Sequence, residues 1–139
     1  MKKIIFAILS FFSFHILSGG YIYYKGTNIA EIEKDGDVYI NGSLAGKIEE
    51  DGDVYYKGSR IGEVEDDGDV YLKGARIGEI QSDGDIYYKG SRIGEVEKDG
   101  DVYYKGSRIG EGKKIKRKWV AAFFFFFFWD IETGKAREF

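Results

Sequence analysis

The chain has 139 residues, with no cysteine, no proline, 20 glycines, 11 tyrosines and a formal net charge of −3. This length favours one domain, and without cysteine neither a disulfide nor a thiolate metal site can stabilise its core. The single histidine, His15, lies near the start, so the rest of the chain has no imidazole for acid–base catalysis, which argues against most hydrolase mechanisms.

Residues 1–20 are typical of a secretory signal peptide. Two lysines precede an apolar run from Ile4 to Leu17, and small residues of the kind that signal peptidases cleave follow it. The run is short and contains serine and histidine, so a membrane-spanning helix is disfavoured. We therefore expect the chain to be exported, and the alternative is an uncleaved N-terminal anchor.

A sixteen-residue unit then repeats through residues 21–112, and its clearest copy is DGDVYYKGSRIGEVED at Asp51–Asp66. A fixed short period is typical of a repeat architecture, in which one unit cannot bury its apolar face alone. The Val-Tyr-Tyr part of each copy predicts a strand. Lys57-Gly58 predicts a two-residue hairpin turn, and the acidic stretch before Gly68 predicts a longer turn.

The register that these turns impose requires a bend in every copy. It pairs Val54 with Ile61 across the hairpin and Val64 with Val70 across the acidic turn. Ile61 and Val64 should then share the buried face although they lie three residues apart, which a regular strand does not allow. Gly62 between them predicts a bulge. Hairpins that bend at a fixed point can be arranged radially, with aliphatic residues at the centre and Asp-Gly turns at the rim.

The leader, the tandem copies of DGDVYYKGSRIGEVE and a tail in which phenylalanines follow alanines resemble the secreted bacterial five-fold beta-flower protein family. Five Asp-Gly turns match a fivefold count: Asp35-Gly36, Asp51-Gly52, Asp67-Gly68, Asp83-Gly84 and Asp99-Gly100. The resemblance implies an all-β repeat protein of short β-hairpins arranged radially with pseudo-fivefold symmetry, and it implies no activity. Half a unit remains at each end, which leaves sixfold symmetry open.

Residues 113–139 form a tail of different composition. A basic run, KKIKRK, precedes an apolar segment whose large residues are Trp119, Phe123, Phe124, Phe125, Phe126, Phe127, Phe128 and Trp129. The segment measures about 17 Å as a helix and about 36 Å as a strand, and the helix is too short for a bilayer of about 30 Å. One interpretation is a buried strand, or a plug that closes the ring. The others are docking on a membrane surface, with the basic run beside anionic lipid, and a dimer interface.

The charges of the two parts have opposite signs. Residues 21–112 carry 12 basic and 21 acidic side chains, a net charge of −9, whereas residues 113–139 carry 7 and 3, a net charge of +4. An acidic repeat body is a poor surface for nucleic acid, which needs basic patches. The basic run could bind an anion or dock on the acidic rim of its own domain.

The repeats also suggest a ligand surface. In four copies a tyrosine faces an arginine across the hairpin: Tyr55 and Arg60, Tyr71 and Arg76, Tyr87 and Arg92, Tyr103 and Arg108. Cross-strand support explains these pairs without a ligand, at about 0.5–1 kcal/mol for each exposed cation–π pair. The functional interpretation is a ring of aromatic faces that stack on a glycan, a peptide or another envelope component.

Other chemistry has weaker support. Asp66, Asp67 and Asp69 could hold calcium, but Asp-Gly is also what such a turn requires. Glu63 and Glu65 do not predict a glycosidase, because repetition gives every copy a similar environment. We expect no cofactor and no catalytic residue. The hypothesis is an exported, non-enzymatic structural or binding module of the bacterial envelope or exterior, and the alternative is a peripheral membrane protein docked through Trp119–Trp129.

Overall fold

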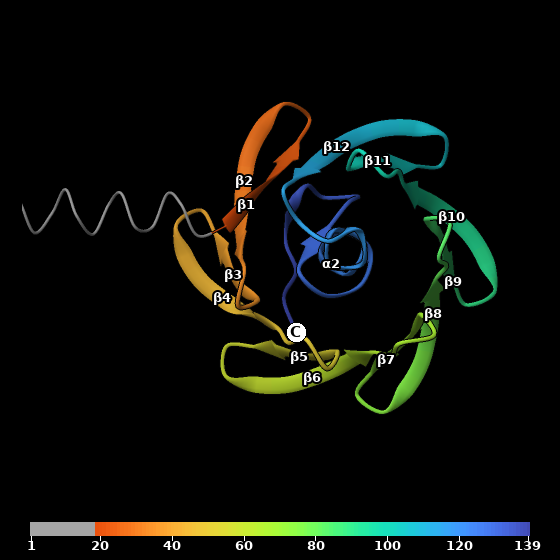
Figure 1. Cartoon of the computed structure of the whole chain (residues 1–139), viewed down its shortest axis with the longest axis horizontal. Helices are drawn as coiled ribbons and strands as arrows, with labels where there is room; N and C mark the ends of the chain where they lie inside the picture. Colours follow the sequence, from red (N-terminus) through yellow and green to blue (C-terminus); the bar gives the residue numbers. More distant parts are fainter. Residues whose placement is uncertain (1–18) are drawn as a thin grey trace, which may run out of the picture.

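Twelve antiparallel strands form a closed ring around a short helix (Figure 1). The structure is a computed structural model that describes residues 19–139, so the body of the predicted signal peptide lies outside the described residues. The strands are β1 (Gly19–Tyr24), β2 (Thr27–Glu33), β3 (Asp37–Ile40), β4 (Ser43–Ile48), β5 (Asp53–Tyr56), β6 (Ser59–Val64), β7 (Asp69–Leu72), β8 (Ala75–Ile80), β9 (Asp85–Tyr88), β10 (Ser91–Val96), β11 (Asp101–Tyr104) and β12 (Ser107–Lys113).

The ring contains six hairpins, which confirms the predicted all-β repeat of radial hairpins and selects sixfold over fivefold symmetry. The five acidic turns are present, but five turns link six hairpins. The last junction is made by pairing β1 with β12, for example Tyr21 opposite Lys113. The two half units at the ends therefore complete the ring. Gly19 and Gly20, which the sequence assigned to the leader, pair with Glu33 and Ile32 in the first hairpin.

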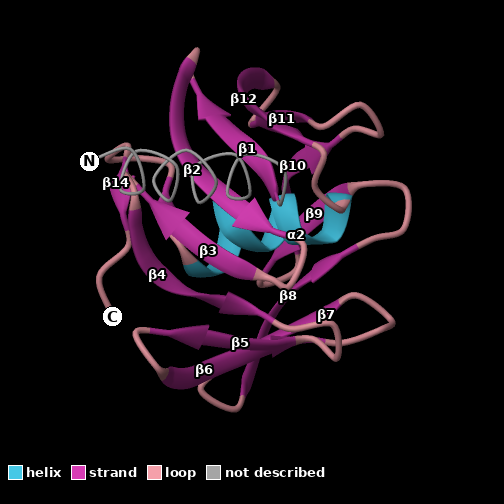
Figure 2. Cartoon of the chain, turned by 60° about the vertical axis from the view of Figure 1, so that its left-hand side comes forward, coloured by secondary structure: helices cyan, strands magenta, loops and turns pink. Residues whose placement is uncertain are grey.

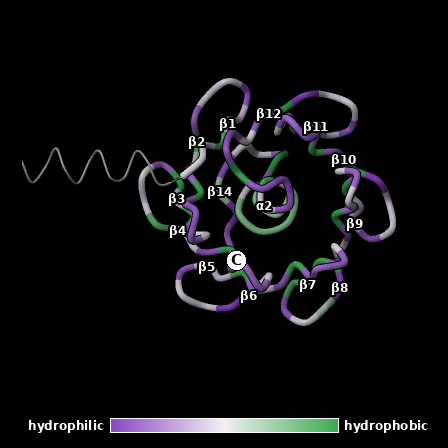
Figure 3. Tube along the Cα trace, in the orientation of Figure 1, coloured by the Kyte–Doolittle hydropathy of each residue, from purple (hydrophilic) through white to green (hydrophobic). Residues whose placement is uncertain are grey.

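The Lys-Gly turns form the outer tips of the hairpins (Figures 1 and 3). Lys57 and Gly58 have φ values of 49° and 86°, as a type I′ turn requires. A Cβ atom on Gly58 would meet nothing within 4 Å, so the tip projects into solvent. The prediction that the Asp-Gly turns form the rim is corrected here: they surround the beginning of the central helix, where Trp119 lies against Gly36.

Each hairpin contains the predicted bulge. In the third hairpin Tyr55 pairs with Arg60 but Val54 pairs with Gly62, so Ile61 is the extra residue. The predicted pairing of Val54 with Ile61 is therefore wrong by one position. The extra residue shifts by one position the alternation of β6 side chains between the inner and outer faces of the ring. Ile61 and Val64 are therefore both buried, at 7% and 4% exposure.

The apolar tail lies inside the ring as a helix, not as the buried strand that was one expectation. Helix α2 (Arg117–Ala122) continues directly into the π-helix η1 (Phe123–Phe127), and Figure 2 shows both enclosed by strands. All six phenylalanines are buried, five of them at 0% exposure. About eight strands already make a barrel that its own side chains can fill. A twelve-stranded ring is wider, so it needs this additional filling.

Consecutive phenylalanines meet consecutive hairpins at the bulge glycines. A Cβ atom added to Gly62 would overlap the Tyr71 carbonyl oxygen and lie 2.6 Å from the Phe127 ring. The same contacts recur in reverse chain order: Gly46 with Phe128, Gly78 with Phe126, Gly94 with Phe125 and Gly110 with Phe124. In these five hairpins the glycine therefore serves two purposes, since it permits the bulge and leaves room for one aromatic ring; the first hairpin has Ala30 at this position.

The π-helical geometry fits this correspondence. An α-helix advances about 100° per residue, whereas six hairpins divide the circle into steps of about 60°. Bonding from residue i to i+5 widens the coil and shortens the step, as in the 3.2 Å bond from the Phe128 N–H to the Phe123 carbonyl. The rings of these two residues stack, with centroids 5.9 Å apart and planes at 16°.

A methyl group at a bulge glycine should test this packing. We expect Gly62→Ala to destabilise the protein by about 1–3 kcal/mol, because the methyl group overlaps the Phe127 ring and a backbone carbonyl. Ser59→Ala, at an exposed position of the same strand, should stay within about 0.5 kcal/mol of the parent. Urea unfolding followed by fluorescence measures both. Equal stabilities would contradict the proposed contact.

Candidate functional site

The predicted tyrosine–arginine pairs exist in register, but the arginines bind carboxylates. Tyr55 lies opposite Arg60, whose Nη2 donates to Asp53 Oδ1 at 2.9 Å and lies 3.8 Å from Glu63 Oε1. The other copies repeat the first contact: Arg76 with Asp69 at 2.8 Å, Arg92 with Asp85 at 2.9 Å and Arg108 with Asp101 at 2.8 Å. Sequence reasoning missed the aspartate, although the bulge that it predicted is what brings Asp53 opposite Glu63.

These ion pairs change the ionisation of the carboxylates. The hydrogen bond from Arg76 lowers the pKa of Asp69, and the bond from Arg108 does the same for the pKa of Asp101. The arginines are about half exposed, so each pair contributes little to stability. Their clearer effect is to cover the outer face of hairpins three to six. Tyr71, Tyr87 and Tyr103 lie beside ion pairs there, as Tyr55 does.

A second set of tyrosines supports the core instead. The Tyr56 ring lies 6.3 Å from Phe128 and 5.0 Å from Phe139, and the Tyr24 ring lies 5.6 Å from Trp129. Each of these two tyrosines immediately precedes a Lys-Gly tip. Their rings line the edge of the plug, so they contribute to closing the ring and are not a free surface for a ligand.

The first two hairpins lack the arginine. Asn28 and Leu44 stand at the positions that carry arginine in hairpins three to six. A groove of about 590 Å³ lies over Asn28 between the first and second hairpins. A second groove of about 380 Å³ lies over Leu44 and Ala45 between the second and third hairpins. Leu44 is 58% exposed, which is unusual for a large apolar side chain in the described part of the chain. The sequence showed the departures in the second copy, but not that they border grooves.

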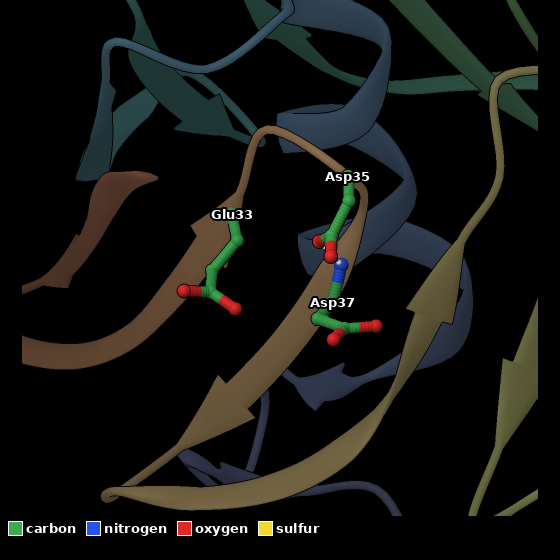
Figure 4. A group of neighbouring side chains, drawn as sticks. All are labelled: Glu33, Asp35 and Asp37. Atoms are coloured by element: carbon green, nitrogen blue, oxygen red, sulfur yellow. Dashed lines mark hydrogen bonds between the residues drawn. The ribbon is translucent and has the colours of Figure 1, made fainter. Parts of the chain in front are cut away.

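The acidic turns bring carboxylates together. Glu33, Asp35 and Asp37 have one oxygen each within 4.8 Å of the others (Figure 4). Three further turns repeat this group: Glu49, Asp51 and Asp53; Glu65, Asp67 and Asp69; Glu97, Asp99 and Asp101. The predicted trio of Asp66, Asp67 and Asp69 is thus replaced by one that contains Glu65.

Turn geometry accounts for these aspartates. Asp35 Oδ1 accepts the Asp37 backbone N–H at 3.0 Å, and the four other turns form the same bond. Burial and the neighbouring Asp35 raise the pKa of Asp37, and burial with Asp99 raises the pKa of Glu97. Oxygen ligands suit calcium, but hydrogen bonding within the turn explains the arrangement without an ion.

The basic run docks on these turns, which was one of its two predicted roles. Lys116 Nζ lies 2.6 Å from Glu50 Oε2, Lys118 Nζ donates to the carbonyls of Glu65 and Asp66 at 3.3 Å, and Arg117 donates to the Ser82 carbonyl. The first turn of α2 contains no acidic residue. The acidic turns of the ring therefore supply the negative charge that a helix N-terminus favours.

The other end of the helix is closed by the last residues. Strands β13 (Trp129–Asp130) and β14 (Lys135–Ala136) form a small hairpin. Arg137 donates to the carbonyls of Phe126 at 2.7 Å and Trp129 at 3.0 Å, and its burial lowers the pKa of its guanidinium. Phe126 lies in the last turn of η1 and Trp129 in β13, so Arg137 caps the end of the helix and ties it to the C-terminal hairpin.

The fold and surface define an all-β ring that carries its own plug. Among residues 19–139 no helix has both the length and the apolar character to cross a bilayer. Comparison with known proteins finds no matching family model, no matching curated protein and no matching solved structure.

Loss of one ion pair should change the pKa of one carboxylate only. In Arg76→Gln we expect the pKa of Asp69 to rise towards the ordinary range of an aspartate, whereas Asp101, still paired with Arg108, keeps its lowered pKa. An NMR titration of the aspartate carboxyls measures both. Because the folded pKa of Asp69 is lowered, its pair stabilises the parent above the unfolded pKa, and this contribution is lost as pH falls through the folded pKa. An unchanged pKa of Asp69 in the variant would contradict the assignment.

Removal of the helix cap should destabilise the protein. Arg137→Met leaves two carbonyls without their donor, so we expect a loss of about 1–3 kcal/mol. The control Arg92→Met makes the same change of side chain but removes only an exposed ion pair, so it should cost less than about 1 kcal/mol. Thermal unfolding of both variants and the parent measures the two losses of stability. An equal loss in the two variants would show that Arg137 is not a cap.

Proposed function

We propose that this chain is an exported, non-enzymatic binding or structural module of the bacterial cell envelope or exterior. The observation that carries the proposal is the composition of the interior: within residues 19–139 the fully buried side chains are all apolar, and charged side chains such as Arg137 are at most partly buried. Catalytic groups are commonly desolvated and held in unlike environments. Here the carboxylates lie in repeated, exposed turns, which favours a scaffold that presents a surface.

Two further observations support this proposal. The first twenty residues have the pattern of a signal peptide, which supports export. The ring is closed at one end by the basic run and at the other by the C-terminal hairpin, which leaves its outer surface as the part available to a partner. The resemblance to the secreted five-fold beta-flower proteins also supports export, although this chain has six hairpins.

The membrane-surface alternative is less well supported. It requires lipid contact through Trp119–Trp129, and these side chains have between 0% and 7% exposure. A dimer interface through the phenylalanines meets the same obstacle. Either contact would require the plug to leave the ring and expose its apolar interior, at a large cost in hydrophobic free energy. We therefore favour a binding or structural role for the ring with its plug in place.

Fractionation of bacteria that express the full chain with a C-terminal tag tests the proposal. We expect a processed protein in the periplasm, envelope or medium, and binding of the purified protein to envelope material. Flotation with vesicles of anionic phospholipid tests the alternative, and we expect no co-flotation. Retention of the unprocessed chain in the cytoplasm would contradict export, and flotation abolished by substitution of the phenylalanines would favour the membrane role.

A further inference from the structure

We propose that the groove between the first two hairpins binds a neutral saccharide, which rests on the proposed binding function. The groove measures about 590 Å³, within the usual size of small-molecule sites. Its floor includes Ile29 and Ala30, which are 8% and 5% exposed. Tyr21, Asn28, Glu31 and Tyr39 supply the polar and aromatic lining. The place differs from the predicted surface, which lay on the arginine-bearing hairpins.

The residues that line this groove differ from those at the equivalent positions of the later hairpins. In the third hairpin Arg60 reaches Asp53 and approaches Glu63, which places an ion pair over the equivalent surface. The first hairpin has Tyr21 at the position of Asp53 and Asn28 at the position of Arg60. Two uncharged residues cannot form that pair. The ionic cover of the later hairpins is therefore replaced by a groove with an aromatic wall.

Strand pairing places two aromatic rings on either side of a carboxylate. Tyr21 in β1 lies opposite Glu31 in β2, and Glu31 lies opposite Tyr39 in β3. Neighbouring strands are about 4.8 Å apart, so the two tyrosines are separated by about 10 Å along the sheet. That spacing suits one sugar ring above Glu31, with its C–H faces towards the tyrosines.

The polar groups select a neutral, hydroxylated ligand. Asn28 and Asn41 offer amides that both donate and accept, and the Glu31 carboxylate accepts from hydroxyl groups. The Tyr39 hydroxyl both donates and accepts, and burial with nearby carboxylates raises its pKa further above neutrality. Residues 21–139, which form the ring and its plug, carry a net charge of −5, and the Glu31 carboxylate lies in the groove itself, so an anionic ligand would be repelled.

The test is an array of neutral gluco-, galacto- and N-acetylglucosamine oligosaccharides. An NMR titration of the full chain follows with the sugar that binds best. We expect chemical-shift changes at the side-chain amides of Asn28 and Asn41. The variant Tyr21→Asp/Asn28→Arg, which restores the residues of the later hairpins, should bind at least about tenfold more weakly. The matched control Arg60→Asn, in the third hairpin, should bind as the parent does.

Three outcomes would overturn the inference. They are absence of binding to any neutral sugar at about 10 mM, binding of anionic sugars alone, and equal binding by Tyr21→Asp/Asn28→Arg and the parent. If envelope binding persists while neutral sugars fail, the saccharide site is wrong and the proposed function stands. If envelope binding also fails, the binding function falls with the site. The thermal stability of each variant is measured first, and Asn28→Arg alone replaces the double variant if the latter is unfolded.

Discussion

The structure depends on filling the interior of a twelve-stranded ring. Protein interiors are close-packed, and a ring of this size cannot be filled by the short aliphatic side chains of its own strands. The chain supplies the missing volume from its tail, as six consecutive phenylalanines, and five of them, Phe124 to Phe128, each meet one hairpin. The bulge glycines of hairpins two to six and the π-helical turn follow from this constraint, since they let one ring lie against each of these five hairpins.

Electrostatics holds the plug at its ends. The acidic turns would repel one another if they stood alone, and the raised pKa of Glu65 and Glu97 reflects burial together with neighbouring carboxylates. Lys116, Arg117 and Lys118 meet three of these turns, so the opposite charges of body and tail act within one molecule. At the far end Arg137 donates to the Phe126 carbonyl of the helix and to the Trp129 carbonyl of β13.

The strands, both turns and the bulge could be predicted because they are local and repeat in every copy. The sixfold count could not, since it depends on pairing β1 with β12 across the whole chain. Nothing in a run of identical phenylalanines distinguishes a strand from a helix, because periodicity is absent. The groove was missed because the sequence shows that Tyr21 and Asn28 depart from the repeat, but only the sheet shows that Tyr21, Glu31 and Tyr39 form a row.

A chain that ends at Lys118, compared with the full chain under the same conditions, tests the central claim most directly. The measurement is an amide-resolved NMR spectrum with thermal unfolding. If the phenylalanine plug is the core, the shortened chain loses its dispersed spectrum and its cooperative transition, while the full chain is a folded protein without detergent. A shortened chain with native-like dispersion and an unchanged melting temperature would contradict the account, because the ring would then be stable without its plug.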